Sequence, residues 1–196
     1  MRAHPYDAPP AASPETAIRR LLVFCGSRDG WNPRHGETAA AVGRLLGERG
    51  VTLVYGGGAL GLMGVLGRAA LAAGGRVEGV IPAFLMDLEV AQAGLSDLAV
   101  VDSLHTRKAR MFEAADAVLA LPGGIGTLDE LVEILSWRNL RLHDRPILLL
   151  GDGGFWEPFV ALIAHMEREG FVGAGVGAHI CHLPSVAALE ALLPCP

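Results

Sequence analysis

Residues 117–127 read Ala-Val-Leu-Ala-Leu-Pro-Gly-Gly-Ile-Gly-Thr, and this segment indicates the architecture of the chain. The five apolar residues at its start predict a short buried strand. Pro122 ends that strand, the glycines form a loop, and a helix that runs to about Leu140 follows. A strand that passes through a glycine loop into a helix is typical of one β-α unit of a parallel sheet.

The same order of elements recurs along the chain. Further strands are expected over residues 21–25, 51–55, 76–81, 98–101, 146–150 and 179–183. Helices are expected over about 33–49, 62–73, 155–169 and 185–193, and one more starts after Asp102 or Ser103. The strands lack period-2 alternation, so both of their faces should be covered. We therefore predict an α/β fold, a doubly wound parallel sheet with helices on both faces, which binds ligands beyond the carboxyl ends of its strands.

Composition places these units in one globular domain. The chain has 196 residues, of which 51% are hydrophobic and 19% charged, so a core can form. We expect a mobile proline-rich tail over residues 1–18 and a single domain over 19–196. The net charge of −5 argues against nucleic acid as a partner, because a broad basic surface is missing.

Cysteine and hydropathy patterns indicate a cytoplasmic protein. The three cysteines are too few and too scattered for a disulfide framework or a C-x-x-C site. Residues 50–67 carry no charge, but seven of these 18 residues are glycine, so a strand, a turn and a helix explain them better than a membrane span. Alternation along residues 179–182 places His179 and Cys181 opposite His182, so no metal site is expected.

Glycine loops follow three of the expected strands. There are 26 glycines, and clusters stand at Gly26, at Gly56–Gly58 and at Gly123–Gly126. Backbone amides at a helix N-terminus can bind phosphate, and glycine lets the phosphate approach the chain closely. One such loop is equally compatible with a simple tight turn, but several on one edge of the sheet favour a phosphorylated ligand.

The second cluster also matches G-x-G-x-x-G at Gly56, Gly58 and Gly61, the pattern of a dinucleotide site. Its context is only partly right, because the match follows the second strand rather than the first. The next acidic residue, Glu78, lies inside the third strand rather than at its end. An NAD-linked enzyme is therefore an alternative, which a titration with NADH would test.

Charged residues flank the third cluster. Arg107, Lys108 and Arg110 fall in the first two turns of a helix, where the helix dipole disfavours cations. This placement indicates either a bound anion nearby or a solvated basic patch. Glu130 and Glu133 follow the glycine loop at i, i+3 spacing and share a helix face. Acidic residues in a first helical turn are favourable by themselves, but a carboxylate beside a phosphate loop could also act on the sugar of a nucleotide.

Together these residues resemble one family. The motif P-G-G-x-G-T-x-x-E is complete from Pro122 to Glu130, and an Arg-Lys pair precedes it at Arg107 and Lys108. Over residues 20–193 the chain resembles the Lonely Guy (LOG) family of cytokinin riboside 5′-monophosphate phosphoribohydrolases, often labelled lysine decarboxylases. The resemblance implies a Rossmann-like homodimer that splits the N-glycosidic bond of purine nucleoside 5′-monophosphates, including AMP. The products would be the free base and ribose 5-phosphate, with no metal or organic cofactor.

The resemblance also assigns roles to residues. Arg107 and Glu130 match the catalytic pair, in which Glu130 would stabilise positive charge on the ribose while Arg107 orients Glu130 and keeps it ionised. The phosphate would be bound by Gly123, Gly124, Ile125, Gly126 and Thr127, and Glu89, Lys108 and Ser136 would also contact or attract the substrate. The chain departs from the family pattern at Arg28, Gln92, Asn139 and Gly151, which leaves the base preference open.

Two further classes stay open at this point. A nucleotide-binding or molybdenum-cofactor-binding protein could use the same scaffold without turnover, although the intact Arg107 and Glu130 pair argues against it. A lysine decarboxylase would need a lysine to carry pyridoxal phosphate, and Lys108 is the only lysine in the chain.

Overall fold

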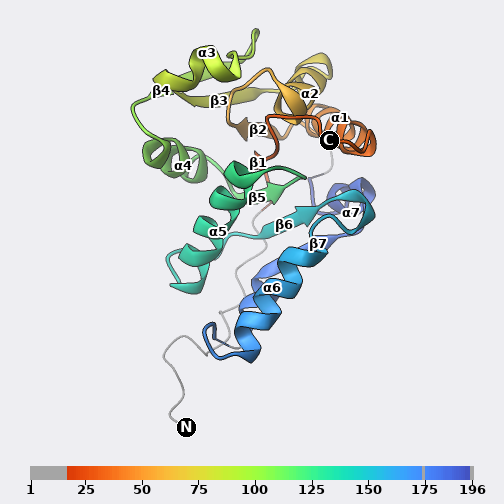
Figure 1. Cartoon of the computed structure of the whole chain (residues 1–196). Coiled ribbons are helices and arrows are strands. Elements are labelled where there is room, and N and C mark those ends of the chain that lie inside the picture. The colour runs from red at the N-terminus through yellow and green to blue at the C-terminus, as the bar shows by residue number, and fades with distance from the viewer. Residues whose placement is uncertain (1–16, 174, 195–196) are drawn as a thin grey trace.

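The computed structural model describes residues 17–173 and 175–194. Its seven parallel strands form one sheet in the order β4-β3-β2-β1-β5-β6-β7 (Figure 1). All seven strands lie within a residue of where the sequence predicts them. Their bounds are Arg20–Phe24 (β1), Thr52–Tyr55 (β2), Val77–Pro82 (β3), Asp97–Val101 (β4), Ala117–Ala120 (β5), Ile147–Leu150 (β6) and Ile180–Leu183 (β7).

Helices connect these strands. They are Arg34–Glu48 (α1), Gly61–Ala72 (α2), Met86–Glu89 (α3), Leu104–Glu113 (α4), Ile125–Asn139 (α5), Glu157–Arg168 (α6) and Val186–Glu190 (α7). Three 3-10 turns are Ala83–Leu85 (η1), Asp152–Gly154 (η2) and Val176–His179 (η3). Side-chain caps fix two helix starts: the Ser103 hydroxyl accepts a hydrogen bond from the Thr106 amide at the start of α4, and the Ser185 hydroxyl accepts one from the Ala188 amide at the start of α7. The short elements η1 and α3 were not predicted from the sequence.

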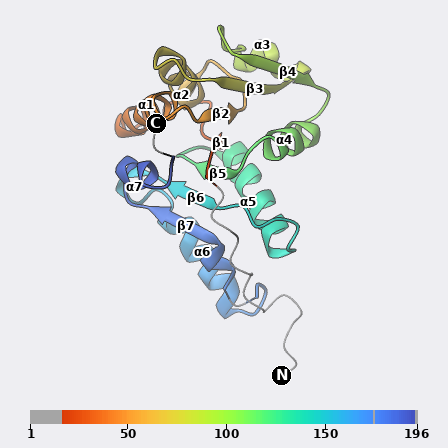
Figure 2. The ribbon, with the colours of Figure 1, turned by 180° about the vertical axis from the view of Figure 1, so that it is seen from behind.

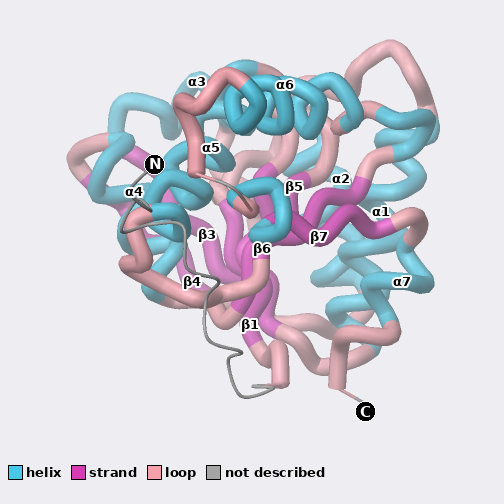
Figure 3. Tube along the Cα trace, turned by 90° about the horizontal axis from the view of Figure 1, so that it is seen from below, coloured by secondary structure: helices cyan, strands magenta, loops and turns pink. Residues whose placement is uncertain are grey.

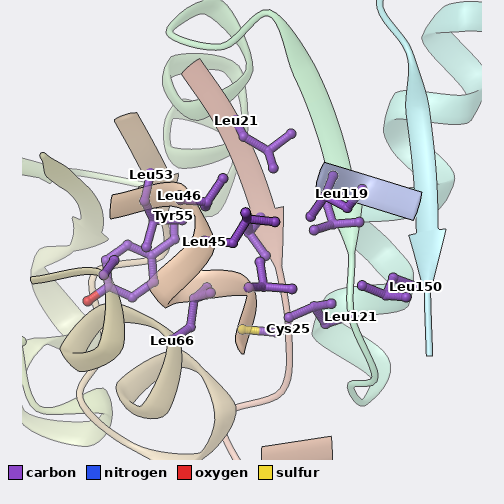
Figure 4. Close-up of a cluster of buried hydrophobic side chains, with 14 of the residues drawn as sticks. Leu21, Cys25, Leu45, Leu46, Leu53, Tyr55, Leu66, Leu119, Leu121 and Leu150 are labelled. Carbon is purple, nitrogen blue, oxygen red and sulfur yellow. The ribbon is translucent and has the colours of Figure 1, made fainter. Parts of the chain in front are cut away.

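The helices cover both faces of the sheet, which confirms the predicted fold class (Figures 2 and 3). One core lies under α1, α2 and α7 and includes Leu46, Leu66 and Leu189 (Figure 4 shows part of it). The other lies under α4, α5 and α6 and includes Met111 and Leu131. The central strands pack against helices on both sides, so β2, β5 and β6 are buried along their whole length. The edge strands β4 and β7 are partly exposed, so the prediction that both faces of the strands are covered does not hold at the two edges.

The chain reverses its direction of winding beside β1. From β1 it proceeds through β2 and β3 to one edge, whereas β5, on the other side of β1, leads to the opposite edge. At the carboxyl ends of these two central strands, the Gly26 amide donates a hydrogen bond to the Pro122 carbonyl at 3.0 Å. A doubly wound sheet binds its ligands at this switch point.

The helix expected over residues 185–193 ends at Glu190, and two further sequence predictions differ from the structure. The predicted tail, residues 1–18, lies outside the described residues except for Ala17 and Ile18, and Ile18 is buried in the first core. The prediction that acidic residues occupy the first turn of the helix after the third glycine loop is wrong: α5 begins at Ile125, so Asp129 and Glu130 lie in its second turn. Among the described residues, no helix is long and apolar enough to cross a membrane.

Candidate active site

A pocket of about 770 Å³ opens at the switch point. The β1–α1 connection, the β5–α5 loop and the start of α2 form most of its lining. The structure brings eight of the ten predicted site residues to this lining: Glu89, Arg107, Gly123, Gly124, Ile125, Gly126, Thr127 and Glu130. Lys108 and Ser136 are not among the residues that line it.

Arg107 is buried and held by three acceptors. Its Nε donates to the Val80 carbonyl at 3.0 Å, and its Nη2 donates to the Gly56 carbonyl at 2.9 Å and to Oε2 of Glu89 at 3.0 Å. A Cβ atom at position 56 would lie only 2.2 Å from Nη2, so the guanidinium requires glycine there. The glycine cluster after β2 thus makes room for Arg107, and none of Gly56, Gly58 and Gly61 lines the pocket, as a dinucleotide site would require.

Glu89 reaches the pocket from the end of α3. The loop that follows is fastened to the turn after β2, because the Ala59 amide donates to the carbonyl of Val90 at 2.7 Å and the Gln92 amide donates to the Gly57 carbonyl at 2.8 Å. Val90 takes a φ of 50°, which is unusual for a β-branched residue. Strain of this kind persists where surrounding contacts enforce it, and here the hydrogen bonds to the turn after β2 supply such contacts.

Glu130 lies on α5 and faces the pocket. Burial raises the pKa of its carboxyl to about 7, while the nearby Arg107 lowers it and the carboxylate of Glu89 raises it further. The expectation that a neighbouring cation keeps Glu130 ionised is therefore wrong in its net effect, because desolvation outweighs the attraction. Glu130 is poised to gain or lose a proton near neutral pH.

The second residue of the Arg-Lys pair has protein partners outside the pocket. Nζ of Lys108 lies 2.9 Å from Oδ2 of Asp129 and 2.9 Å from Oε2 of Glu133. Burial lowers the pKa of Lys108, but these ion pairs outweigh it and hold the pKa above its ordinary value. The basic segment of α4 suggested a bound anion nearby. The structure instead pairs Arg107 with the carboxylate of Glu89, and Lys108 with the carboxylates of Asp129 and Glu133 on α5.

The N-terminus of α5 faces the pocket without a side-chain cap. Gly124 is its N-cap residue and has no side chain that could accept from the first amides of the helix. Thr127 is buried in the first turn, and Ile125 and Gly126 line the pocket beside it. Free amides at the positive end of a helix dipole suit an anionic group such as phosphate.

Sequence reasoning missed the aromatic side of the pocket. Trp31 and His35 line it from the β1–α1 connection, and Phe155 lines it from the segment after β6. A signal was present in Asp29-Gly30-Trp31-Asn32, where a tryptophan stands among turn residues just after a central strand. Phe155 had no such signal, because only the fold brings the β6–α6 connection to the β1–α1 connection.

Comparison with protein families gives one match. Residues 63–191 match the model of the family described as "Possible lysine decarboxylase". The residues of the pocket do not fit the pyridoxal phosphate that such a reaction uses, because Lys108, the only lysine, is ion-paired with Asp129 and Glu133 and does not line the pocket.

Solved structures share the fold. A molybdenum cofactor binding protein from Rippkaea orientalis is 20% identical with a TM-score of 0.67, over 89% of this chain and 94% of that one. A Moco carrier protein from Chlamydomonas reinhardtii is 20% identical with a TM-score of 0.65, over 88% and 93% of the two chains. At this identity the likeness concerns the fold alone and confirms that it is Rossmann-like.

Curated proteins are more similar in sequence. The cytokinin riboside 5′-monophosphate phosphoribohydrolase LOG of Oryza sativa is 41% identical over 88% of this chain and 71% of its own length. The enzyme of the same description from Rhodococcoides fascians is 44% identical over 79% of this chain and 78% of its own length. The chain therefore belongs to the LOG family of cytokinin riboside 5′-monophosphate phosphoribohydrolases, as its P-G-G-x-G-T-x-x-E motif indicates.

Proposed function

We propose that this protein hydrolyses the N-glycosidic bond of purine and cytokinin riboside 5′-monophosphates, including AMP, to the free base and ribose 5-phosphate. One observation carries the proposal: a carboxyl with a pKa near neutrality, Glu130, lines the same pocket as the open N-terminus of α5 and the buried Arg107. The identity of about 40% to phosphoribohydrolases over most of the chain supports the same reaction. No comparable observation favours a cofactor carrier.

The loop Gly123–Thr127 would hold the 5′-phosphate. Its amides and the dipole of α5 favour a dianion, and binding there fixes the ribose relative to Glu130. Binding energy from the phosphate, which does not react, can be used to orient the sugar. Nucleosides that lack the phosphate should therefore react far more slowly than nucleotides.

Glu130 would act on the bond that breaks. As the C1′–N9 bond of the nucleotide breaks, its electron pair moves to the base and positive charge develops on the ribose. Ionised Glu130 would stabilise that charge and take a proton from water as the water oxygen bonds to C1′. The base leaves with the electron pair and takes a proton from solvent, and Glu130 releases the proton that it took from water to solvent, which restores its ionised form.

Arg107 and Glu89 would shape the site around this step. Arg107 is fastened to Val80, Gly56 and Glu89, so its charge is fixed beside Glu130, whose pKa it lowers. We propose that the remaining guanidinium surface binds polar atoms of the substrate and that Glu89 contacts the ribose.

We also propose a cytoplasmic homodimer. On α5, Leu128, Val132 and Ser136 recur at four-residue spacing and all three are exposed, and Ile125 is 82% exposed at the start of the helix. The exposed apolar side chains Ile125, Leu128 and Val132 suit burial against a second copy of the chain. Ser136 would then face the partner rather than the pocket of its own subunit, and Lys108 would act by its charge.

Product analysis tests the activity. The protein is incubated with AMP, with isopentenyladenosine 5′-monophosphate and with adenosine, and base and ribose 5-phosphate are quantified. We expect turnover of the two nucleotides, little of adenosine, and loss of turnover in Glu130→Gln. Glu133→Gln is the matched control, because this residue stands one turn further along α5 and pairs with Lys108 outside the pocket. A fully active Glu130→Gln, or equal rates on AMP and adenosine, would contradict the proposal.

A further inference from the structure

Trp31 is fully exposed at the edge of the pocket, with a relative accessibility of 103%. The other two tryptophans of the chain are half-buried (Trp137) or buried (Trp156). Leaving a large aromatic side chain in water forgoes the free energy that its burial would release. An isolated ring of this kind beside a cavity suits a ligand that covers it.

The backbone around Trp31 is fixed although its side chain is free. Gly30 has a φ of 73°, and a Cβ atom there would lie 3.1 Å from the ring of His35. On the other side, Oδ1 of Asn32 accepts a hydrogen bond from the Arg34 amide at 3.1 Å, and the Asn32 carbonyl accepts one from the His35 amide at 3.1 Å. The turn therefore holds Trp31 at the pocket edge.

A rigid aromatic wall belongs to the same pocket. The rings of His35 and Phe155 meet edge to face with centroids 5.6 Å apart, and Phe155 packs in the same way on Trp156 at 5.1 Å. Nε1 of Trp156 donates to the Ala120 carbonyl at 3.2 Å, which anchors this row to β5. Nδ1 of His35 is buried without a hydrogen-bond partner in the described part of the chain, so a polar ligand atom could pair with it.

We propose that Trp31 is the stacking platform for the purine base and closes over it against the wall of His35 and Phe155. This inference rests on the proposed function and adds the site of the base to it. Within the described lining, Trp31, His35 and Phe155 are the only residues with aromatic rings, whereas the α5 N-terminus suits phosphate and Glu89, Arg107 and Glu130 suit the ribose. A purine has two π-faces and needs such surfaces.

Kinetics with Trp31→Ala and Trp31→Phe test the platform. Loss of one base-stacking contact should raise KM for AMP by about 5- to 150-fold in Trp31→Ala, and Trp31→Phe should keep most of the affinity. Inhibition by ribose 5-phosphate, which has no base, should change less than about twofold. Phe171→Ala is the matched control, because Phe171 is 86% exposed and does not line the pocket. An unchanged KM for AMP in Trp31→Ala overturns the inference, and so does an equal weakening of ribose 5-phosphate.

Fluorescence separates this inference from the proposed reaction. The emission of wild type minus that of Trp31→Phe isolates Trp31, and it can be measured with Glu130→Gln as the background so that no turnover occurs. We expect AMP, but not ribose 5-phosphate, to quench this component. If wild type hydrolyses no nucleotide but AMP quenches the emission of Trp31, base stacking on Trp31 is supported and the proposed hydrolysis is contradicted. If AMP binds without quenching, or if Trp31→Ala instead changes the oligomeric state in gel filtration, the platform is overturned.

Discussion

Nη2 of Arg107 lies 3.0 Å from Oε2 of Glu89, so the buried cation of this site is paired with the loop after β3. Within the described residues Arg107 has no ion pair with Glu130, the carboxyl to which the family motif couples it. Arg107 therefore joins the second and third β-α connections to α4, and it acts on Glu130 through its field.

Replacement of Arg107 by lysine should impair the enzyme although the charge is kept. A lysine ammonium cannot reach the carbonyls of Val80 and Gly56 and the Glu89 carboxylate with the fixed geometry of a guanidinium. We expect kcat/KM for AMP to fall about 100-fold, as for a misplaced catalytic group. Arg107→Ala should in addition destabilise the fold by about 3–5 kcal/mol, because it leaves Glu89 unpaired. Assays of AMP hydrolysis and urea unfolding check both, and a Lys variant with nearly wild-type kcat/KM would show that charge alone suffices.

The activity should depend on pH through Glu130. Its pKa is raised to about 7, and the proposed reaction needs the ionised form. We expect kcat/KM for AMP, which follows the ionisation of the free enzyme, to fall about tenfold per unit as the pH drops below 7 and to level off above it. Asp129→Asn should move the inflection to lower pH, because the Asp129 carboxylate raises the pKa of Glu130. A rate that rises as the pH falls would instead assign Glu130 the role of a proton donor.

The Glu130 carboxyl should lower the free energy of unfolding at neutral and alkaline pH. The folded protein binds the proton of Glu130 more tightly than the unfolded chain does, so wild type loses stability as the pH rises from the ordinary value of 4.5 to about 7. Glu130→Gln escapes this loss. Its free energy of unfolding should exceed that of wild type by up to ~3 kcal/mol at pH 8, with a much smaller difference at pH 4. Equal differences at both values, measured by urea unfolding, would contradict the raised pKa.

Replacement of Gly56 by alanine should displace Arg107. The added Cβ would lie 2.2 Å from Nη2 and would force the guanidinium away from Glu89. We expect a loss of activity similar to that of Arg107→Lys. Gly36→Ala is the matched control, because a Cβ on Gly36, in α1, meets nothing within 4 Å. That change should leave turnover intact and stabilise the helix by about 0.5–1 kcal/mol; wild-type activity in Gly56→Ala would show that Arg107 tolerates movement.

Local sequence patterns were enough to predict the strands, the fold class and part of the pocket. Apolar runs, glycine loops and helix caps are short-range features, so they located all seven strands within a residue and gave the doubly wound parallel sheet. The motif from Pro122 to Glu130 likewise combines a loop with a helix start, and seven of its nine residues line the pocket. Adjacent residues meet in any fold, which is why such features can be recognised from the order of residues.

The features that could not be predicted from the sequence all depend on contacts between residues that lie far apart in the chain. Arg107 finds Gly56 across 51 positions and Glu89 across 18, and Phe155 meets His35 because β6 lies two strands from β1. Sequence suggested that a cation would keep Glu130 ionised, but only packing sets its desolvation, which raises its pKa to about 7. Burial and through-space charge are properties of the assembled pocket, and so is the exposure of Trp31 at its edge.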